Sequence, residues 1–111
     1  MESKPATNMV ATRCKSEDQA KFDRWLDEVH IPMLLKCPGM TKVTRYKIAK
    51  ESQGSPTRLV IYEFKDRKAL EEYENSPELA AARKETKETW PGDGFEITWR
   101  IQFEEIKAYV K

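Results

Sequence analysis

The single histidine of the chain, His30, is the side chain best suited to acid–base chemistry. It follows Phe22 and Leu26 at helical spacing, which places it on or beside the apolar face of a helix. In an apolar pocket, a histidine can act as a general acid or a general base. Alternatively, His30 is hydrogen-bonded to a nearby carbonyl or carboxylate and fixes the end of the helix. Asp27 and Glu28 could orient the imidazole, but helical geometry favours solvated or ion-paired carboxylates there.

Arg45 and Tyr46 are neighbours in a predicted strand, so their side chains point to opposite faces of the sheet. Only one of them can therefore line a pocket under the helices. We expect this to be Tyr46, whose phenol would donate a hydrogen bond to a substrate oxygen. Arg45 would then face a dimer interface or solvent.

Aromatic side chains are frequent for so small a chain and could wall a flat, apolar substrate by stacking. Packing in the core explains most of them equally well. The candidates for substrate contact are Trp25, Tyr62, Trp90 and Trp99.

The cysteines and glycines predict neither a metal site nor a cofactor site. Cys14 and Cys37 have no CxxC spacing, and with one histidine they cannot form a structural zinc site without carboxylates or a second chain. Both are expected to be free, packed thiols, although a disulfide between them is conceivable. A nucleophilic Cys14 would need His30 as its base, which makes it a weak candidate. The four glycines are scattered and form no phosphate-binding loop.

Composition excludes several classes of partner. Lys and Arg number 20 against 19 Asp and Glu, with the signs interleaved, so no basic field favours nucleic acid or an anionic membrane. Apolar runs are too short to span a bilayer, and residues 1–8 lack the order of a secretion signal. A cytoplasmic protein is therefore expected. The length of 111 residues suits a single domain over 1–111.

The first half of the chain predicts a strand and a helix. Residues 9–14 contain β-formers and no breaker. Ser16 is the expected N-cap of the helix, with Gln19 as its capping-box partner. Pro32 removes a backbone donor and should loosen the helix, which ends before Gly39.

A hairpin and a broken helix follow. Residues 41–50 and 57–65 read as two strands joined by a polar loop with Gly and Pro. Asp66 can cap the next helix, which Ser76 and Pro77 interrupt before it resumes.

The last strand has the clearest pattern. Apolar residues alternate with polar ones from 95 to 103, as in a half-buried antiparallel strand. Trp99 lies within this apolar set and is expected to be deeply buried. The alternation fails after Glu104, which predicts a bulge or a separate arm over about 105–111.

Together these elements give the order βαββαβ. We therefore predict an α+β, ferredoxin-like domain, with two helices on one face of a four-stranded antiparallel sheet. The strand around residues 59–62 carries apolar side chains on both faces. Since an exposed apolar sheet face usually has a partner, we expect a homodimer joined sheet to sheet.

The stretch from Phe22 to Pro32, followed by Pro38-Gly39-Met40 and Arg45-Tyr46, resembles the EthD-like families of the dimeric α/β-barrel superfamily. The resemblance implies a dimer with an apolar pocket between sheet and helices in each subunit. It also implies a histidine at position 30 that acts on the substrate. The superfamily includes cofactor-free monooxygenases, polyketide decarboxylases and cyclases, and haem-degrading enzymes. The haem-degrading members carry an iron-ligating histidine on the second helix, and this chain has none there.

The expected function is binding of an apolar or aromatic small molecule without a cofactor. His30 as acid or base and Tyr46 as hydrogen-bond donor would support decarboxylation, dehydration or ring closure. Two alternatives remain: a binding protein without chemistry, and a cofactor-free monooxygenase of the antibiotic-biosynthesis type.

Overall fold

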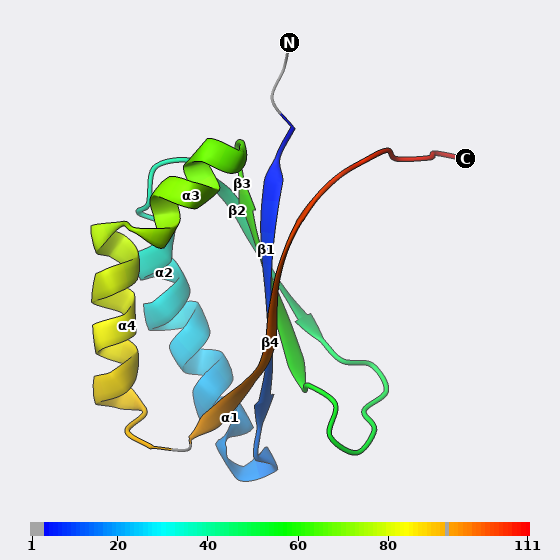
Figure 1. The fold of residues 1–111 in the computed structure, drawn as a ribbon. Helices are drawn as coiled ribbons and strands as arrows, with labels where there is room; N and C mark the ends of the chain where they lie inside the picture. Colours follow the sequence, from blue (N-terminus) through cyan, green and yellow to red (C-terminus); the bar gives the residue numbers. More distant parts are fainter. Residues whose placement is uncertain (1–3, 93) are drawn as a thin grey trace.

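The computed structural model describes residues 4–92 and 94–111, and its order of elements is the predicted one (Figure 1). Four strands form one antiparallel sheet in the order β2-β3-β1-β4, and the helices pack on one of its faces. The predicted α+β, ferredoxin-like fold is thus confirmed. The elements are β1 (Ala6–Cys14), α1 (Ser16–Trp25), a π-helical turn η1 (Leu26–His30), α2 (Ile31–Leu34), β2 (Met40–Lys47), β3 (Arg58–Phe64), α3 (Arg67–Glu74), α4 (Pro77–Thr89) and β4 (Phe95–Glu104).

The core lies between the helices and the sheet. The largest fully buried side chains are Phe22 and Leu34 from the first helical segment, Phe64 from β3 and Leu70 from α3. These side chains come from both the helical layer and the sheet, so the apolar faces of the helices pack against the sheet.

The cap predicted for α3 forms, but the cap predicted for α1 does not. Asp66 and Ser76 accept hydrogen bonds from the backbone N–H groups three residues ahead. Ser16, in contrast, is already helical, and Lys15 stands at the N-cap without a side-chain bond. The capping box predicted for Gln19 is wrong because its amide bonds to Asp23 and to the Thr57 hydroxyl instead.

Pro32 loosens the first helix as expected, and the structure shows how. Helices α1 and α2 are continuous through the π turn η1, in which the N–H of Ile31 donates to the carbonyl of Leu26. Pro32 lacks an N–H, and its ring crowds the carbonyl of Glu28. The wider π turn relieves this crowding and sets the direction of His30, its last residue.

A β-bulge in β4 corrects the expectation for its apolar face. Ala11 pairs with Trp99, whereas Thr12 pairs with Ile97, so Thr98 is the extra residue. Its hydroxyl donates to the carbonyl of Ala11 at 3.0 Å. The alternation therefore changes phase at Thr98. Phe95 and Ile97, before it, face the helices, whereas Trp99, Ile101 and Phe103, after it, face the uncovered side of the sheet. Trp99 is 40% exposed, and its predicted deep burial is wrong for the single chain.

The uncovered sheet face is apolar. Tyr46, Trp99, Ile101 and Phe103 are all exposed there. Tyr46 pairs with Leu59 of β3, and Trp99 and Ile101 pair with Ala11 and Met9 of β1. The molecule is flat, with extents of 48 × 38 × 19 Å, because only one layer of helices covers the sheet. Residues 105–111 leave the domain as an extended arm (Figure 1).

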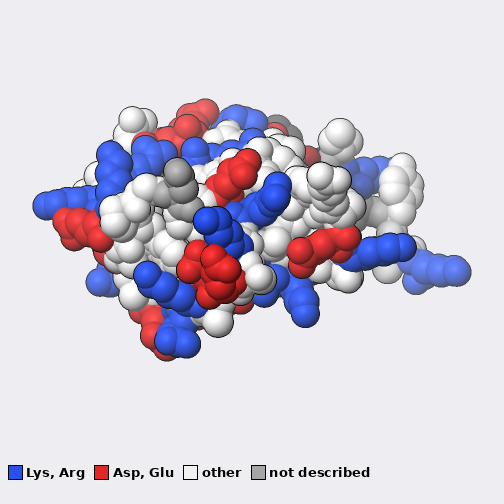
Figure 2. Space-filling view, turned by 90° about the horizontal axis from the view of Figure 1, so that it is seen from below, with Lys and Arg blue, Asp and Glu red and all other residues white. Residues whose placement is uncertain are grey.

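Charges on the surface are mixed. In the view of Figure 2, acidic and basic side chains lie beside one another, in keeping with a formal net charge of +1. Among the described residues, no helix has the length and apolar character needed to cross a membrane.

Candidate functional site

A cavity of about 590 Å³ lies between the helices and the sheet. This volume is in the range of sites that hold small organic molecules. Its outer wall contains exposed charged side chains of α4 and β4, which mark the side open to solvent. The lining residues are Asn8, Val10, Thr12, Phe22, Trp25, Leu26, His30, Leu34, Val60, Tyr62, Tyr73, Glu74, Leu79, Arg83, Thr86, Lys87, Phe95, Ile97, Arg100 and Gln102.

His30 lies in this wall, stacked on the indole of Trp25 with ring centroids 4.7 Å apart. Its Nδ1 is 3.4 Å from the hydroxyl of Thr86. That hydroxyl donates its hydrogen to the carbonyl of Ala82 at 2.7 Å. The Thr86 oxygen must then accept from His30, so the imidazole proton sits on Nδ1 and the lone pair on Nε2.

The imidazole is uncharged at neutral pH. Burial lowers the pKa of His30 from 6.5 to about 4, and the nearby carboxylate of Glu85 opposes this only in part. Glu85 is itself held by the indole N–H of Trp25 at 2.8 Å. His30 is therefore an acceptor of hydrogen bonds and protons at pH 7, and little imidazolium is present to act as an acid.

Hydroxyl groups from three elements share the cavity with His30. Burial raises the pKa of Tyr62 far above its usual range and raises that of Tyr73 to about 12, so both phenols keep their protons. Thr12 is 4% exposed, and its hydroxyl has no hydrogen-bond partner among the described residues. An unpaired buried hydroxyl is costly. The hydroxyl of Thr12 is therefore a polar group in the cavity wall that can bond to a ligand.

The assignment of Arg45 and Tyr46 to the two sheet faces is reversed. Arg45 pairs with Val60 on the helix side, and its guanidinium binds Asp23 and Asp27. Tyr46 points to the uncovered face and is 50% exposed, so it does not reach the cavity. The helix carboxylates decide the outcome, because they draw the arginine toward α1.

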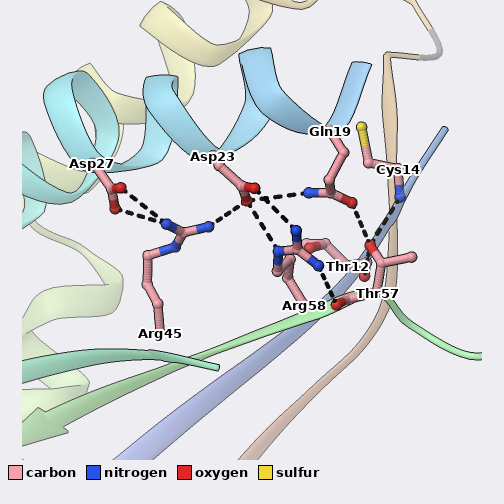
Figure 3. A network of polar contacts seen from close by, with 8 residues as sticks. All are labelled: Thr12, Cys14, Gln19, Asp23, Asp27, Arg45, Thr57 and Arg58. Atoms are coloured by element: carbon pink, nitrogen blue, oxygen red, sulfur yellow. Dashed lines mark hydrogen bonds and ion pairs between the residues drawn. The ribbon is translucent and has the colours of Figure 1, made fainter. Parts of the chain in front are cut away.

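Asp23 is the centre of a polar network that joins α1 to the sheet (Figure 3). Its carboxylate accepts two bonds from Arg58, both at 3.1 Å, and one from Arg45. Burial alone would raise the pKa of Asp23, but the two guanidiniums outweigh it and lower the pKa. This network fixes the helix over the strands and lies outside the cavity wall.

The four aromatic candidates lie in three different places. Trp25 and Tyr62 line the cavity as predicted substrate contacts would. Trp90 is buried behind it, packed against Trp25 and Phe95, and does not belong to the lining. Trp99 lies on the opposite face of the sheet because of the bulge. The structure therefore places two of the four expected contacts outside the pocket.

The sequence pattern did not indicate some of the charged lining residues. Arg83 and Lys87 were visible only as part of a charged helix. Arg100 was assigned to the solvent side of an alternating strand. Only the bulge, which no local pattern marked, brings it to the cavity.

The cysteines are not at the cavity. Cys14 and Cys37 are buried and unbonded to each other, and burial raises the pKa of both thiols. Each is a protonated, weak nucleophile. Within residues 4–92 and 94–111, no three His, Cys, Asp or Glu side chains gather closely enough to hold a metal ion.

Comparison with known proteins gives the family and supports the fold. The family model for a domain of unknown function, DUF4286, matches residues 7–105. The chain belongs to the DUF4286 family. No protein among those with curated functions matches it.

Solved structures share the architecture of this DUF4286 chain at low sequence identity. An EthD-family protein from Bacillus halodurans C-125 is 19% identical, with a TM-score of 0.67 over 91% of this chain and 99% of that one. HapK from Hahella chejuensis is 12% identical, with a TM-score of 0.71 over 96% and 98%. A MhuD variant with two manganese protoporphyrin IX molecules bound per active site is 11% identical, with a TM-score of 0.67 over 96% and 99%. The resemblance to EthD-like proteins is thus confirmed at the level of the fold.

Proposed function

We propose that this protein binds a flat apolar or aromatic molecule in the cavity between sheet and helices, and that His30 acts on it as a base. One observation carries the proposal: the Trp25–His30 stack and the unpaired hydroxyl of Thr12 share a cavity of about 590 Å³. Apolar walls supply binding, and a few convergent polar groups set the orientation of the ligand.

The chemistry would be proton transfer without a bound cofactor. Nε2 of His30 accepts a proton from the bound molecule, and negative charge develops on an oxygen of that molecule. The protonated phenols of Tyr62 and Tyr73 can donate hydrogen bonds to this oxygen. Dehydration and ring closure both pass through such a step, and the enclosing aromatic side chains keep water away from it.

The test uses an extract of small molecules from the protein's own cells. Wild-type protein and His30→Gln are incubated with the extract and analysed by mass spectrometry, together with any molecule that each retains. We expect a compound that wild type consumes and His30→Gln only binds, because loss of a general base lowers turnover about 100-fold or more. Equal consumption by both proteins would contradict the role of His30.

A second candidate function is binding without chemistry, and the low pKa of His30 favours it. A base with a pKa of about 4 is a weak one at neutral pH. In this case the bound molecule would be recovered unchanged from wild type. His30→Gln would alter its affinity only slightly, since the imidazole would be one contact among many.

We further propose that the uncovered sheet face joins two copies of the chain. The exposed side chains of Trp99, Ile101 and Phe103 support this, because monomers seldom leave a contiguous apolar face in water. A two-fold arrangement would place the same face of each sheet against the other.

A further inference from the structure

Positive charge surrounds the open side of the cavity. Arg83 and Lys87 are one helical turn apart on α4, and Arg100 lines the same cavity from β4. None of the three takes part in an ion pair among the described residues. The single carboxylate of the lining, Glu74, accepts a hydrogen bond from Gln102 at 3.2 Å. The cavity wall is therefore cationic although the whole chain is nearly neutral.

The bulge in β4 is what brings Arg100 to this wall. Arg100 pairs with Val10, whose side chain also lines the cavity. Its charge acts on both phenols, since it lowers the pKa of Tyr62 and of Tyr73 against the stronger effect of burial. Arg83 acts on Tyr73 in the same way. Both guanidiniums thus act on Tyr73 and belong to the same cavity wall.

We infer that the ligand of this cavity is a planar carboxylic acid, with its carboxylate between Arg83 and Arg100 and its apolar body against Trp25. This inference rests on the proposed function and adds the chemical class of the ligand. A guanidinium presents paired N–H donors that match the two oxygens of a carboxylate. The apolar depth of the cavity excludes a small, strongly hydrated anion, which would lose its water without gaining contacts there.

The orientation of the ligand in the cavity follows from the positions of the polar side chains. Arg83 and Arg100 are exposed at the open side, so the carboxylate stays near water. Trp25 is buried and stacked on His30, so the ring system of the ligand reaches inward to the imidazole. This arrangement leaves the end of the ligand remote from its carboxylate beside His30.

The test compares 2-naphthoate with its neutral methyl ester by isothermal titration calorimetry at low salt. Wild type is expected to bind the acid more tightly than the ester. Arg83→Gln and Arg100→Gln should each weaken binding of the acid about tenfold, and leave binding of the ester unchanged. Lys84→Gln is the matched control, because it removes the same charge from α4 at a position outside the cavity wall. Circular dichroism checks that each variant is folded.

The possible outcomes distinguish the inferred class of ligand from the proposed function of the cavity. Equal binding of acid and ester would overturn the carboxylate inference and leave the apolar cavity as a binding site. An equal loss of acid binding in Lys84→Gln would also overturn it, since the preference would then be a general effect of charge. Binding of neither probe, in folded protein, would count against the proposed function itself.

Discussion

His30 links the chemistry of the cavity to the stability of the fold, because it is buried in its neutral form. Its pKa is about 4 in the folded chain against an ordinary value of 6.5, so the unfolded chain binds more protons between these two values. The stabilising contribution is complete above about pH 6.5 and is lost progressively as the pH falls toward 4. We expect wild type to lose roughly 2 kcal/mol more than His30→Gln between pH 7 and pH 4.5. Urea unfolding at both pH values measures this, and parallel losses in the two proteins would show that His30 is not desolvated.

Asp23 and Asp27 offer a matched pair of carboxylates on one helix. Asp23 binds Arg45 and Arg58 with 27% of its side chain exposed, whereas Asp27 binds Arg45 alone and is 57% exposed. Asp23→Asn would leave two partly buried guanidiniums without their common partner. We expect it to lower the free energy of unfolding by about 2 kcal/mol, and Asp27→Asn by about 0.5 kcal/mol or less. Urea unfolding at neutral pH compares them, and equal effects would mean that the network adds nothing beyond surface ion pairs.

At the scale of elements, the turn between α2 and β2 depends on Gly39. Its φ is +88°, and a Cβ there would lie 2.6 Å from the Cβ of Ala69 on α3. Gly54 has a similar φ of +80° but nothing near the position of a Cβ, which makes it the control. Gly39→Ala should cost about 3 kcal/mol, from backbone strain and overpacking together, against about 1 kcal/mol for Gly54→Ala. Both variants carry the backbone strain, but only Gly39→Ala adds the overpacking, so their difference in thermal unfolding measures the overpacking. Similar melting temperatures would show that α3 moves aside without cost.

Local sequence signals allowed most of the helices and strands to be predicted. The features that were not predicted depend on pairing between distant strands. Asp66 and Ser76 cap helices through backbone groups three residues away, and Pro32 acts on its own turn, so each is visible in a short stretch of sequence. The bulge at Thr98 exists only in the pairing of β4 with β1, which no local pattern reports. One extra residue moved Trp99 to the uncovered face and Arg100 to the cavity wall.

The same limit applies to the candidate site. Sequence periodicity located His30, and the cavity confirms that it lies on the inner side of its helix. For Arg45 and Tyr46, the periodicity predicts that the two side chains point to opposite faces of the sheet. It does not predict which of them points toward the helices. That choice depends on Asp23, which is distant in sequence and adjacent only after α1 packs on the sheet.

At the scale of the whole molecule, the apolar open face makes the oligomeric state testable. A stable pair of sheets needs about 800 Å² from each partner, and the exposed aromatic and aliphatic side chains of β4 and β2 lie where that contact would form. Ile101→Glu puts a charge in the middle of this face, on a strand whose pairing with β1 it leaves intact. We expect a dimer for wild type at micromolar concentration in sedimentation equilibrium, and a folded monomer for Ile101→Glu, since a buried unpaired charge costs several kcal/mol. Leu35→Glu is the control, because Leu35 is equally apolar and similarly exposed but lies beside the helices. A monomeric wild type, or a dimer that Leu35→Glu disrupts and Ile101→Glu does not, would place the contact elsewhere on the molecule.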